Sequence, residues 1–111
     1  MASPLQQIVE LQLPAAASLL YLSPVGVWTQ ITKLTCTNVD TSSHAVTFYI
    51  VPQSGTSATS NAVTFGKAIL AKDTWNSPNE YGLVINPSCS LWGFADTASV
   101  VNAFVAGLLS S

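Results

Sequence analysis

Charge is what this sequence has least of. Only 7% of its 111 residues are charged, against about 25% in an ordinary soluble domain. The three cations are all lysine, arginine is missing, and the formal net charge is −2. A protein that follows nucleic-acid phosphates needs a basic stripe, and one that binds an anionic membrane surface needs a polybasic cluster. The composition excludes both classes, and such a weakly charged surface is expected where other subunits cover much of it.

Long apolar runs and a secretory leader are missing as well. The longest apolar stretch near the C-terminus, Val100 to Leu109, is interrupted by Asn102 and is far shorter than the ~20 residues of a membrane span. No basic residue precedes an apolar run near Met1, and Glu10 interrupts the residues that follow. We therefore expect a chain that is made, and at least initially used, in a cytosol and that has no membrane partner.

Metal-binding spacings are lacking too. His44 is the sole histidine, and Cys36 and Cys89 are the two cysteines. The three side chains could be imagined around zinc, but no CxxC or HxxxH spacing supports such a site. We expect no metal and no cofactor, and we interpret His44 as a turn-flanking residue at the start of a strand. The cysteines could pair in principle, but their apolar, strand-like neighbours favour buried thiols.

No catalytic constellation stands out. Four of the five acids, Asp40, Asp73, Glu80 and Asp96, fall in or beside predicted turns, where carboxylates are ordinarily solvated. A Ser-His-Asp arrangement could always be assembled from fourteen serines, so that abundance carries no information. Nucleophile-elbow, phosphate-loop and dinucleotide motifs are not found. The sequence therefore predicts no catalytic residues and a protein that is not an enzyme.

What the sequence does have is an apolar pattern with a period of two, broken by turn residues. This pattern predicts about eight short antiparallel strands in a single all-β sandwich domain over residues 1–111, jelly-roll-like or immunoglobulin-like. The expected strands are Leu5–Leu13, Ser18–Leu22, Trp28–Val39, Ala45–Val51, Ala62–Phe65, Ala68–Ala71, Tyr81–Ile85, Cys89–Ala95 and Ser99–Leu108. In the third of these the apolar phase changes near Thr32-Lys33, which indicates a β-bulge. A short helical turn is the competing interpretation of Pro14 to Leu22, because of its three alanines.

The fourth predicted strand supplies the expected core. Val46, Phe48 and Ile50 share one of its faces, with Leu34 and Cys36 expected opposite or adjacent.

Two polar loops follow this strand in the sequence. Gln53–Asn61 has no large apolar residue and is expected to order on assembly. Asp73–Glu80 carries Trp75, which we expect to be an exposed contact residue, since tryptophan is enriched at interfaces.

From Ser18 to Leu109 the order of strands and turns is similar to that of small structural proteins from the virions of tailed bacteriophages. The similarity is carried by LLYLSPVG, WTQITKLTCTNVDTSS, AVTFYIVPQSG, AILAKDTW, GLVINP and ASVVNAFVAGLL. Members of that family usually have an acidic Gly-Asp turn before the penultimate strand, where this chain has Asn86-Pro87-Ser88. The resemblance implies a β-sandwich structural protein of the phage particle, without enzyme activity.

Within this class we expect a capsid decoration or cement protein that binds the assembled shell. Its partners would then be other virion proteins, above all the major capsid protein, and copies of itself in a homo-oligomer. A neck, collar or tail protein of the virion is the alternative. A carbohydrate- or receptor-binding module on the particle, and a small hydrolase or metal enzyme on a sandwich scaffold, represent other classes of function.

The candidate interface residues lie mostly in the first thirteen residues, which the family pattern does not require. Leu5, Ile8, Val9, Leu11 and Leu13 are too many apolar side chains for a free tail. Residues 1–13 are therefore either an edge strand of the same molecule or an arm that adds to the sheet of a neighbouring subunit. Sequence reasoning favours the arm, so that deletion of residues 1–13 is expected to leave a folded sandwich. Trp75 completes the candidate interface.

Overall fold

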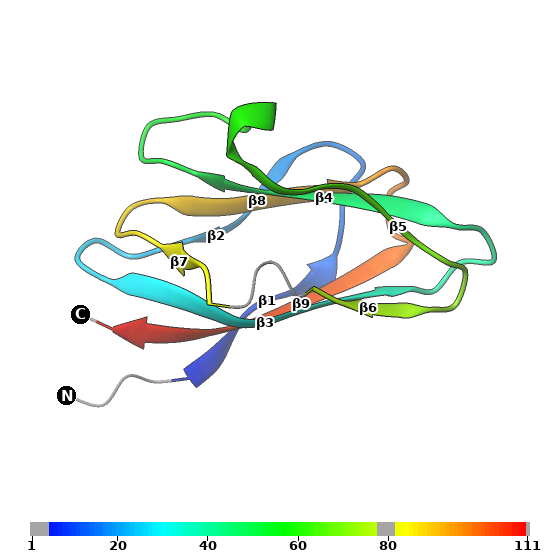
Figure 1. Ribbon diagram of the computed structural model, residues 1–111, viewed down its shortest axis with the longest axis horizontal. Coiled ribbons are helices and arrows are strands. Elements are labelled where there is room, and N and C mark those ends of the chain that lie inside the picture. Colours follow the sequence, from blue (N-terminus) through cyan, green and yellow to red (C-terminus); the bar gives the residue numbers. More distant parts are fainter. Residues whose placement is uncertain (1–4, 78–81, 111) are drawn as a thin grey trace.

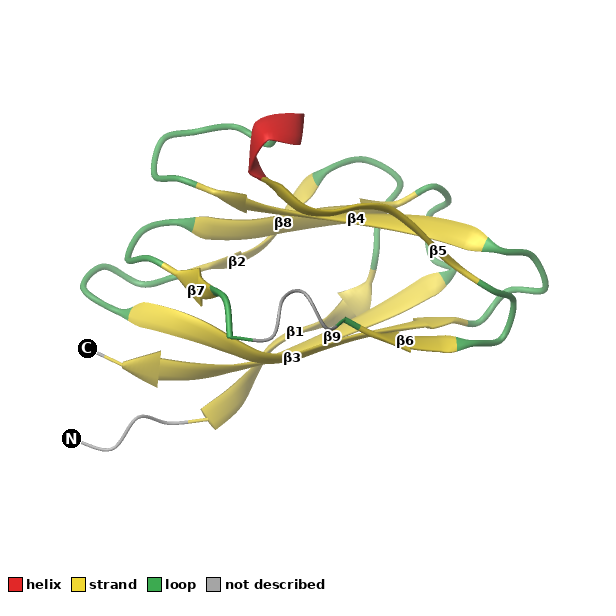
Figure 2. Ribbon diagram, in the orientation of Figure 1, coloured by secondary structure: helices red, strands yellow, loops and turns green. Residues whose placement is uncertain are grey.

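The chain folds into two antiparallel β-sheets packed face to face (Figure 1). The computed structural model describes residues 5–77 and 82–110. Its strands are β1 (Leu5–Gln12), β2 (Ser18–Leu22), β3 (Trp28–Asn38), β4 (His44–Val51), β5 (Ala62–Ile69), β6 (Thr74–Asn76), β7 (Val84–Ile85), β8 (Ser90–Ala95) and β9 (Val101–Ser110). Within this part of the chain the helical structure is a single 3-10 turn, η1 (Thr59–Asn61; Figure 2). The all-β sandwich expected from the sequence is confirmed.

The strand order identifies the type of sandwich. One sheet, here called the β3 sheet, has the order β1-β9-β3-β6, and β7 also pairs with β3. The other, the β4 sheet, has the order β2-β8-β4-β5. The antiparallel pairs are therefore nested, because β1 pairs with β9, β2 with β8, β3 with β6 and β7, and β4 with β5. Nested pairing in two sheets of this order is a jelly roll. An immunoglobulin sandwich is excluded, because its first strand pairs with its second.

The core lies between the sheets and is built by the side chains that the period of two turns inward. Phe48 and Val46 of the β4 sheet are fully buried, and Ile50 packs half-buried against the same cluster. Leu34 and Cys36 reach this core from β3 in the opposite sheet and are also fully buried. The core-facing positions predicted on β4 are thus confirmed.

Phe48 has its space because the neighbouring strand carries a glycine. Gly93 of β8 stands opposite Phe48 in the β4 sheet. A Cβ atom added to Gly93 would lie 2.7 Å from Cδ1 of Phe48 and 3.0 Å from Cδ1 of Leu20. Only a residue without a side chain allows the aromatic ring to lie this close to the β8 backbone.

The β-bulge predicted in the third strand is present. The register of β3 against β9 shifts between Ile31 and Lys33, so that Thr32 is the extra residue. Ile31 before the bulge and Leu34 after it are both fully buried. The bulge therefore explains the change of apolar phase, because the extra residue turns the apolar side chains of the second half of β3 back toward the core.

Several predicted boundaries are wrong. Ala62–Phe65 and Ala68–Ala71 are not two strands, because β5 continues through a bulge around Gly66, whose φ of 65° suits glycine. The predicted loop at residues 73–80 contains β6, which pairs with β3. The strand expected at residues 81–85 is reduced to β7, and residues 78–81 lie outside the described part of the chain. Ser18–Leu22 is a strand, so the helical interpretation of this segment is also wrong.

The turn at residues 86–88 closes without glycine. The N–H of Cys89 donates to the carbonyl of Asn86 at 3.0 Å, and the N–H of Ser88 donates to the carbonyl of Ser23. Ser88 has a φ of 65°, in the left-handed region that glycine normally occupies.

Neither Cys89 nor the buried Cys36 takes part in a disulfide, which agrees with the interpretation of both as thiols.

Candidate functional site

Three turns meet at one end of the sandwich and form a polar cluster with many internal hydrogen bonds. They connect β3 to β4, β5 to β6 and β8 to β9. Asn38, at the end of β3, is fully buried between them. Its amide nitrogen donates to the carbonyls of Ser42 and Ile69 at 2.8 and 3.0 Å, and its side-chain oxygen accepts the N–H of Asp40. Asn38 thereby ties the β3–β4 turn to the end of β5.

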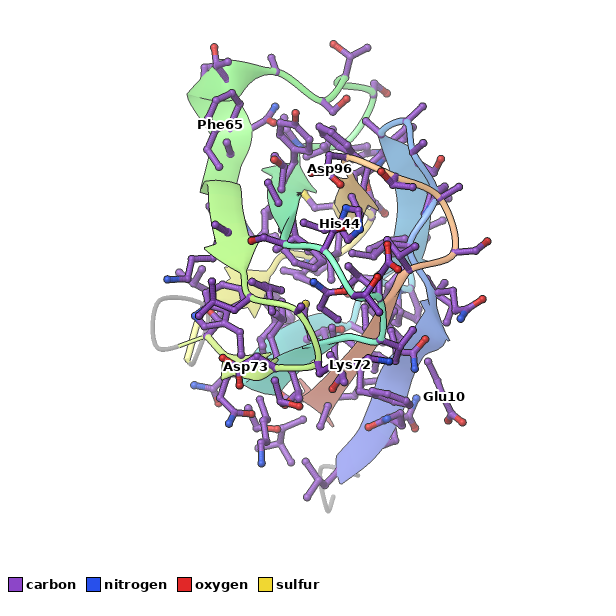
Figure 3. The ribbon with its side chains drawn as sticks, turned by 90° about the vertical axis from the view of Figure 1, so that its right-hand side faces the viewer. Glu10, His44, Phe65, Lys72, Asp73 and Asp96 are labelled. Carbon is purple, nitrogen blue, oxygen red and sulfur yellow. The ribbon has the colours of Figure 1, made fainter. Side chains whose placement is uncertain are left out.

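His44, the first residue of β4, is held between two carboxylates. Its Nδ1 lies 2.7 Å from Oδ1 of Asp96, and its Nε2 lies 2.7 Å from Oδ2 of Asp40. Asp96 belongs to the β8–β9 turn, and its second oxygen accepts the N–H of Ala45 at 3.0 Å. Figure 3 looks onto this end of the molecule and shows His44 and Asp96 side by side. We call these three residues the histidine clamp.

The clamp favours a charged imidazole and two charged carboxylates. Hydrogen bonds to Asp40 and then to Asp96 raise the pKa of His44. The hydrogen bond from His44, followed by that from the Thr41 N–H, lowers the pKa of Asp40. Desolvation acts to raise the pKa of Asp96, but the hydrogen bonds from Ala45 and His44 outweigh it and the pKa is lowered. Both ring nitrogens therefore act as donors, as they do in an imidazolium.

This arrangement makes His44 a structural residue. A general base needs a ring nitrogen with an available lone pair, and in the clamp both nitrogens are already engaged with carboxylates. Across the described residues, no group of three His, Cys, Asp or Glu side chains is placed to hold a metal ion. The same residues form no helix that is long and apolar enough to cross a membrane.

The histidine clamp predicts a bell-shaped dependence of stability on pH. The contribution of His44 is fully present below its ordinary pKa of 6.5 and is lost as the pH rises through its raised folded pKa. The contributions of Asp40 and Asp96 are present above their ordinary pKa of 3.8 and are lost as the pH falls through their lowered values. The thermal midpoint, measured by circular dichroism from pH 3 to 9, should be highest between these two ordinary pKa values.

The matched control is His44→Gln, which leaves an amide in place of the titrating ring. This variant should melt at a lower temperature than the parent at pH 5.5 and should lose the decline on the alkaline side. If the parent keeps a constant midpoint from pH 5 to 9, the clamp does not contribute to stability in the way its geometry indicates.

A second candidate site is the outer face of the β4 sheet, which carries no charge. Residues that stand opposite one another in an antiparallel pair point to the same face, so the register identifies its members. They are Leu19 and Leu22 of β2, Ser90, Trp92 and Phe94 of β8, Ala45, Thr47, Tyr49 and Val51 of β4, and Ala62 and Ala68 of β5. Phe65 joins them, because it follows the buried Thr64, which stands opposite the core-facing Phe48. Thr47, Tyr49, Val51 and Ser90, at the centre of this face, are buried. Tyr49 stacks on Phe94 with ring centroids 6.3 Å apart. We call this surface the uncharged face.

Three of the apolar side chains on the uncharged face are open to solvent. Leu19, Leu22 and Phe65 are exposed by 51, 55 and 67%. The outer face of the β3 sheet differs in charge, because it carries Glu10 and Lys33. It also exposes apolar side chains, those of Leu5, Trp28, Val84 and Phe104. In Figure 3 the labelled Phe65 and Glu10 lie on the two opposite sheets. Both outer faces thus expose apolar side chains, and the face of the β4 sheet is the one without charged residues.

The candidate residues near the N-terminus do not form an arm. They lie in or just after β1, which pairs with β9 of the same chain from Leu5 to Gln12. Val9 and Leu13 are buried in the core, and Ile8 packs against it. Leu5 and Leu11 remain exposed. Of the two alternatives, the structure shows the edge strand, because β1 covers the otherwise open edge of β9.

Trp75 is not the exposed contact residue that its polar neighbours suggested. It lies on β6 opposite Cys36, on the side of the strand that faces the core, and it packs half-buried against the core cluster. The ammonium group of Lys67 lies over its ring, 5.8 Å from the centroid. One face of the indole is thus occupied by a cation of the same chain.

Comparisons with protein families, with characterised proteins and with solved structures find no match to this chain. Its function must therefore be inferred from the two surfaces described above and from the fold that positions them.

Proposed function

We propose that this protein is a non-enzymatic structural component of a tailed-phage particle, and specifically a decoration protein that adheres to the assembled capsid. The observation that carries the proposal is the uncharged face of the β4 sheet. Exposed leucine and phenylalanine side chains on one face of a sheet are typical of a contact with another protein. We assign this surface to the contact with the major capsid protein.

The physical argument rests on what the uncharged face gains from being covered. A leucine or phenylalanine side chain that moves from water to a packed interface contributes about 1.5–3 kcal/mol. The large apolar members that are exposed lie on both edge strands of the sheet, at Leu19, Leu22 and Phe65. A partner that touches all three must therefore span the whole sheet, so binding depends on the intact fold and is weakly sensitive to salt.

The fold and the sequence add support of a different kind. Jelly rolls recur in viral capsid and lectin domains, although a fold does not by itself determine a function. The resemblance of residues 18–109 to small virion proteins of tailed phages points to the particle. Trp75 is half-buried with Lys67 over its ring, so this face of the indole is not available for stacking on a sugar.

The test is binding to capsids that lack the protein. Particles from a phage with this gene deleted are mixed with purified protein, sedimented and examined by immunogold electron microscopy. The parent should sediment with the particles and label their heads. Phe65→Asp should weaken binding about tenfold or more, because it places an unpaired charge in a dry interface.

Gln30→Asp is the matched control, since it introduces the same charge at an exposed position on the outer face of the β3 sheet. It should bind like the parent. Gold label on the neck or tail would instead indicate a neck, collar or tail protein of the virion. Equal binding by Phe65→Asp and the parent, or no binding by the parent, would contradict the proposal.

A further inference from the structure

Three edges of the sandwich are protected against pairing with another strand. At one edge of the β3 sheet, β6 and β7 have only three and two residues. β2 has five residues, and its ladder is interrupted between Leu19 and Tyr21. β5 bulges at Gly66 and places Lys67 opposite the core-facing Val46. Short strands, bulges and inward-pointing charges are devices that natural proteins use to blunt sheet edges.

The fourth edge, β1, has one bulge, between Gln7 and Val9, but it is long and nearly uncharged. It has eight residues and pairs with β9 along one side, and no strand in the described part of the chain pairs with its other side. Glu10 is its single charged residue. All of its side chains except that of Val9 are exposed or half-buried. An edge of this kind presents unpaired backbone N–H and C=O groups, so its natural ligand is another β-strand.

The register against β9 gives the direction of each side chain on β1. The outward-pointing residues are Leu5, Gln7, Glu10 and Gln12, opposite Leu108, Ala106, Phe104 and Asn102. The core-facing residues are Gln6, Val9 and Leu11, opposite Gly107, Val105 and Ala103. Ile8 is the extra residue of a bulge and packs against the core, 3.3 Å from the position that a Cβ atom on Gly107 would occupy. Ile8 and Val9 thus form a central pair that points inward, and the side chains on either side of this pair alternate in direction. The sequence of directions is therefore the same from Leu5 to Gln12 as from Gln12 to Leu5.

We infer that β1 pairs with β1 of a second copy of this chain, antiparallel and about a two-fold axis between Ile8 and Val9. Antiparallel pairing about this axis requires a strand whose side-chain directions are symmetric about its centre, and β1 meets that requirement. The opposed pairs are Leu5 with Gln12, Gln6 with Leu11, Gln7 with Glu10, and Ile8 with Val9. A shift of one residue in either direction would place outward side chains opposite core-facing ones, so the register is specified.

The charges are compatible with this self-pairing. In the specified register Glu10 lies opposite Gln7 of the other copy, where the amide can donate to the carboxylate. The two Glu10 carboxylates are separated by about 10 Å along the strands, more than the Debye length of roughly 8 Å at physiological salt. The bulges at Ile8 meet at the axis, so both strands bend alike. The symmetric pattern favours a second copy over an unrelated strand, and the inference does not rest on the proposed capsid contact, which lies on the other sheet.

The experiment measures the monomer–dimer equilibrium of the full chain by sedimentation, with substitutions placed at the Gln7–Glu10 pair. The parent should dimerise. Gln7→Glu creates two like-charge pairs and should raise the dissociation constant about tenfold. Adding Glu10→Lys to Gln7→Glu replaces each repulsion by an attraction and should restore dimerisation. Gln30→Glu, an exposed position on β3 in the same sheet, should leave the dissociation constant unchanged.

Thermal melting of each variant separates loss of pairing from loss of folding, since Gln7 is exposed and its replacement should leave the midpoint of the monomer near that of the parent. A parent that stays monomeric at millimolar concentration overturns the inference. A dimer that is insensitive to Gln7→Glu, or that is not restored by adding Glu10→Lys, also overturns it. A monomer that binds capsids in a manner sensitive to Gln7→Glu would assign the β1 edge to a strand of another protein.

Discussion

Replacement of Phe48 by alanine is expected to lower the free energy of unfolding by about 3–5 kcal/mol. Phe48 is the largest of the fully buried side chains, and its ring fills the space left open by Gly93 on the adjacent strand. Because the surrounding strands are fixed by their ladders, the site can collapse only in part and a cavity remains. A small domain has about 5–15 kcal/mol of stability in total, so urea denaturation should show a large fall in the midpoint.

Phe65→Ala is the matched control, because it removes the same side chain from a position that is 67% exposed on an adjacent strand. Its effect should stay within about 0.5 kcal/mol, as is usual for surface substitutions. A near-neutral result for Phe48→Ala, or equal losses for the two variants, would show that the assignment of faces on β4 and β5 is wrong.

Deletion of residues 1–13 should prevent the chain from folding. The truncated chain loses Val9 and Leu13 from the core and exposes the edge of β9, the strand with which β1 pairs along its length. Each large aliphatic side chain removed from a core costs about 2–5 kcal/mol, so the loss of both, together with a strand, is comparable to the whole stability of a small domain. The truncated protein should show no near-ultraviolet circular dichroism signal from its tryptophans and no cooperative melting transition.

Two point substitutions separate the contribution of the buried side chains of residues 1–13 to stability from that of the exposed ones. Leu13→Ala, at a fully buried position, should destabilise the full-length chain by about 2–5 kcal/mol. Leu5→Ala, at a position that is 65% exposed, should be close to neutral. A truncated chain that melts cooperatively would instead restore the alternative in which residues 1–13 are dispensable for folding.

The sequence was sufficient for those features that depend on local pattern. Alternation of apolar and polar residues located β4 and its core face, and the change of phase within β3 located the bulge beside Lys33. Both follow from the two-residue period of a strand, because one extra residue turns all the side chains that follow to the opposite face. Proline residues and polar clusters located most strand ends to within a few residues, because these residues favour turns.

Features that depend on topology were beyond the sequence. The apolar pattern from Leu5 to Leu13 is the same whether the strand completes its own sheet or that of a neighbour. Trp75 lies among polar residues because β6 is a three-residue edge strand whose flanking side chains point outward. The histidine clamp joins His44 to Asp96 across 52 positions, and only the nested pairing of strands brings them together.

That nested pairing also determines how the molecule carries a mechanical load. The first and last strands are antiparallel neighbours, with Leu5 opposite Leu108. Tension applied to these two strand ends therefore acts along the interstrand hydrogen bonds and opens them one after another. Tension applied along a strand loads the bonds of its ladder together, as shear, and meets greater resistance. A molecule held through its sheet faces or along its strands is mechanically strong, whereas one tethered by its two ends peels apart.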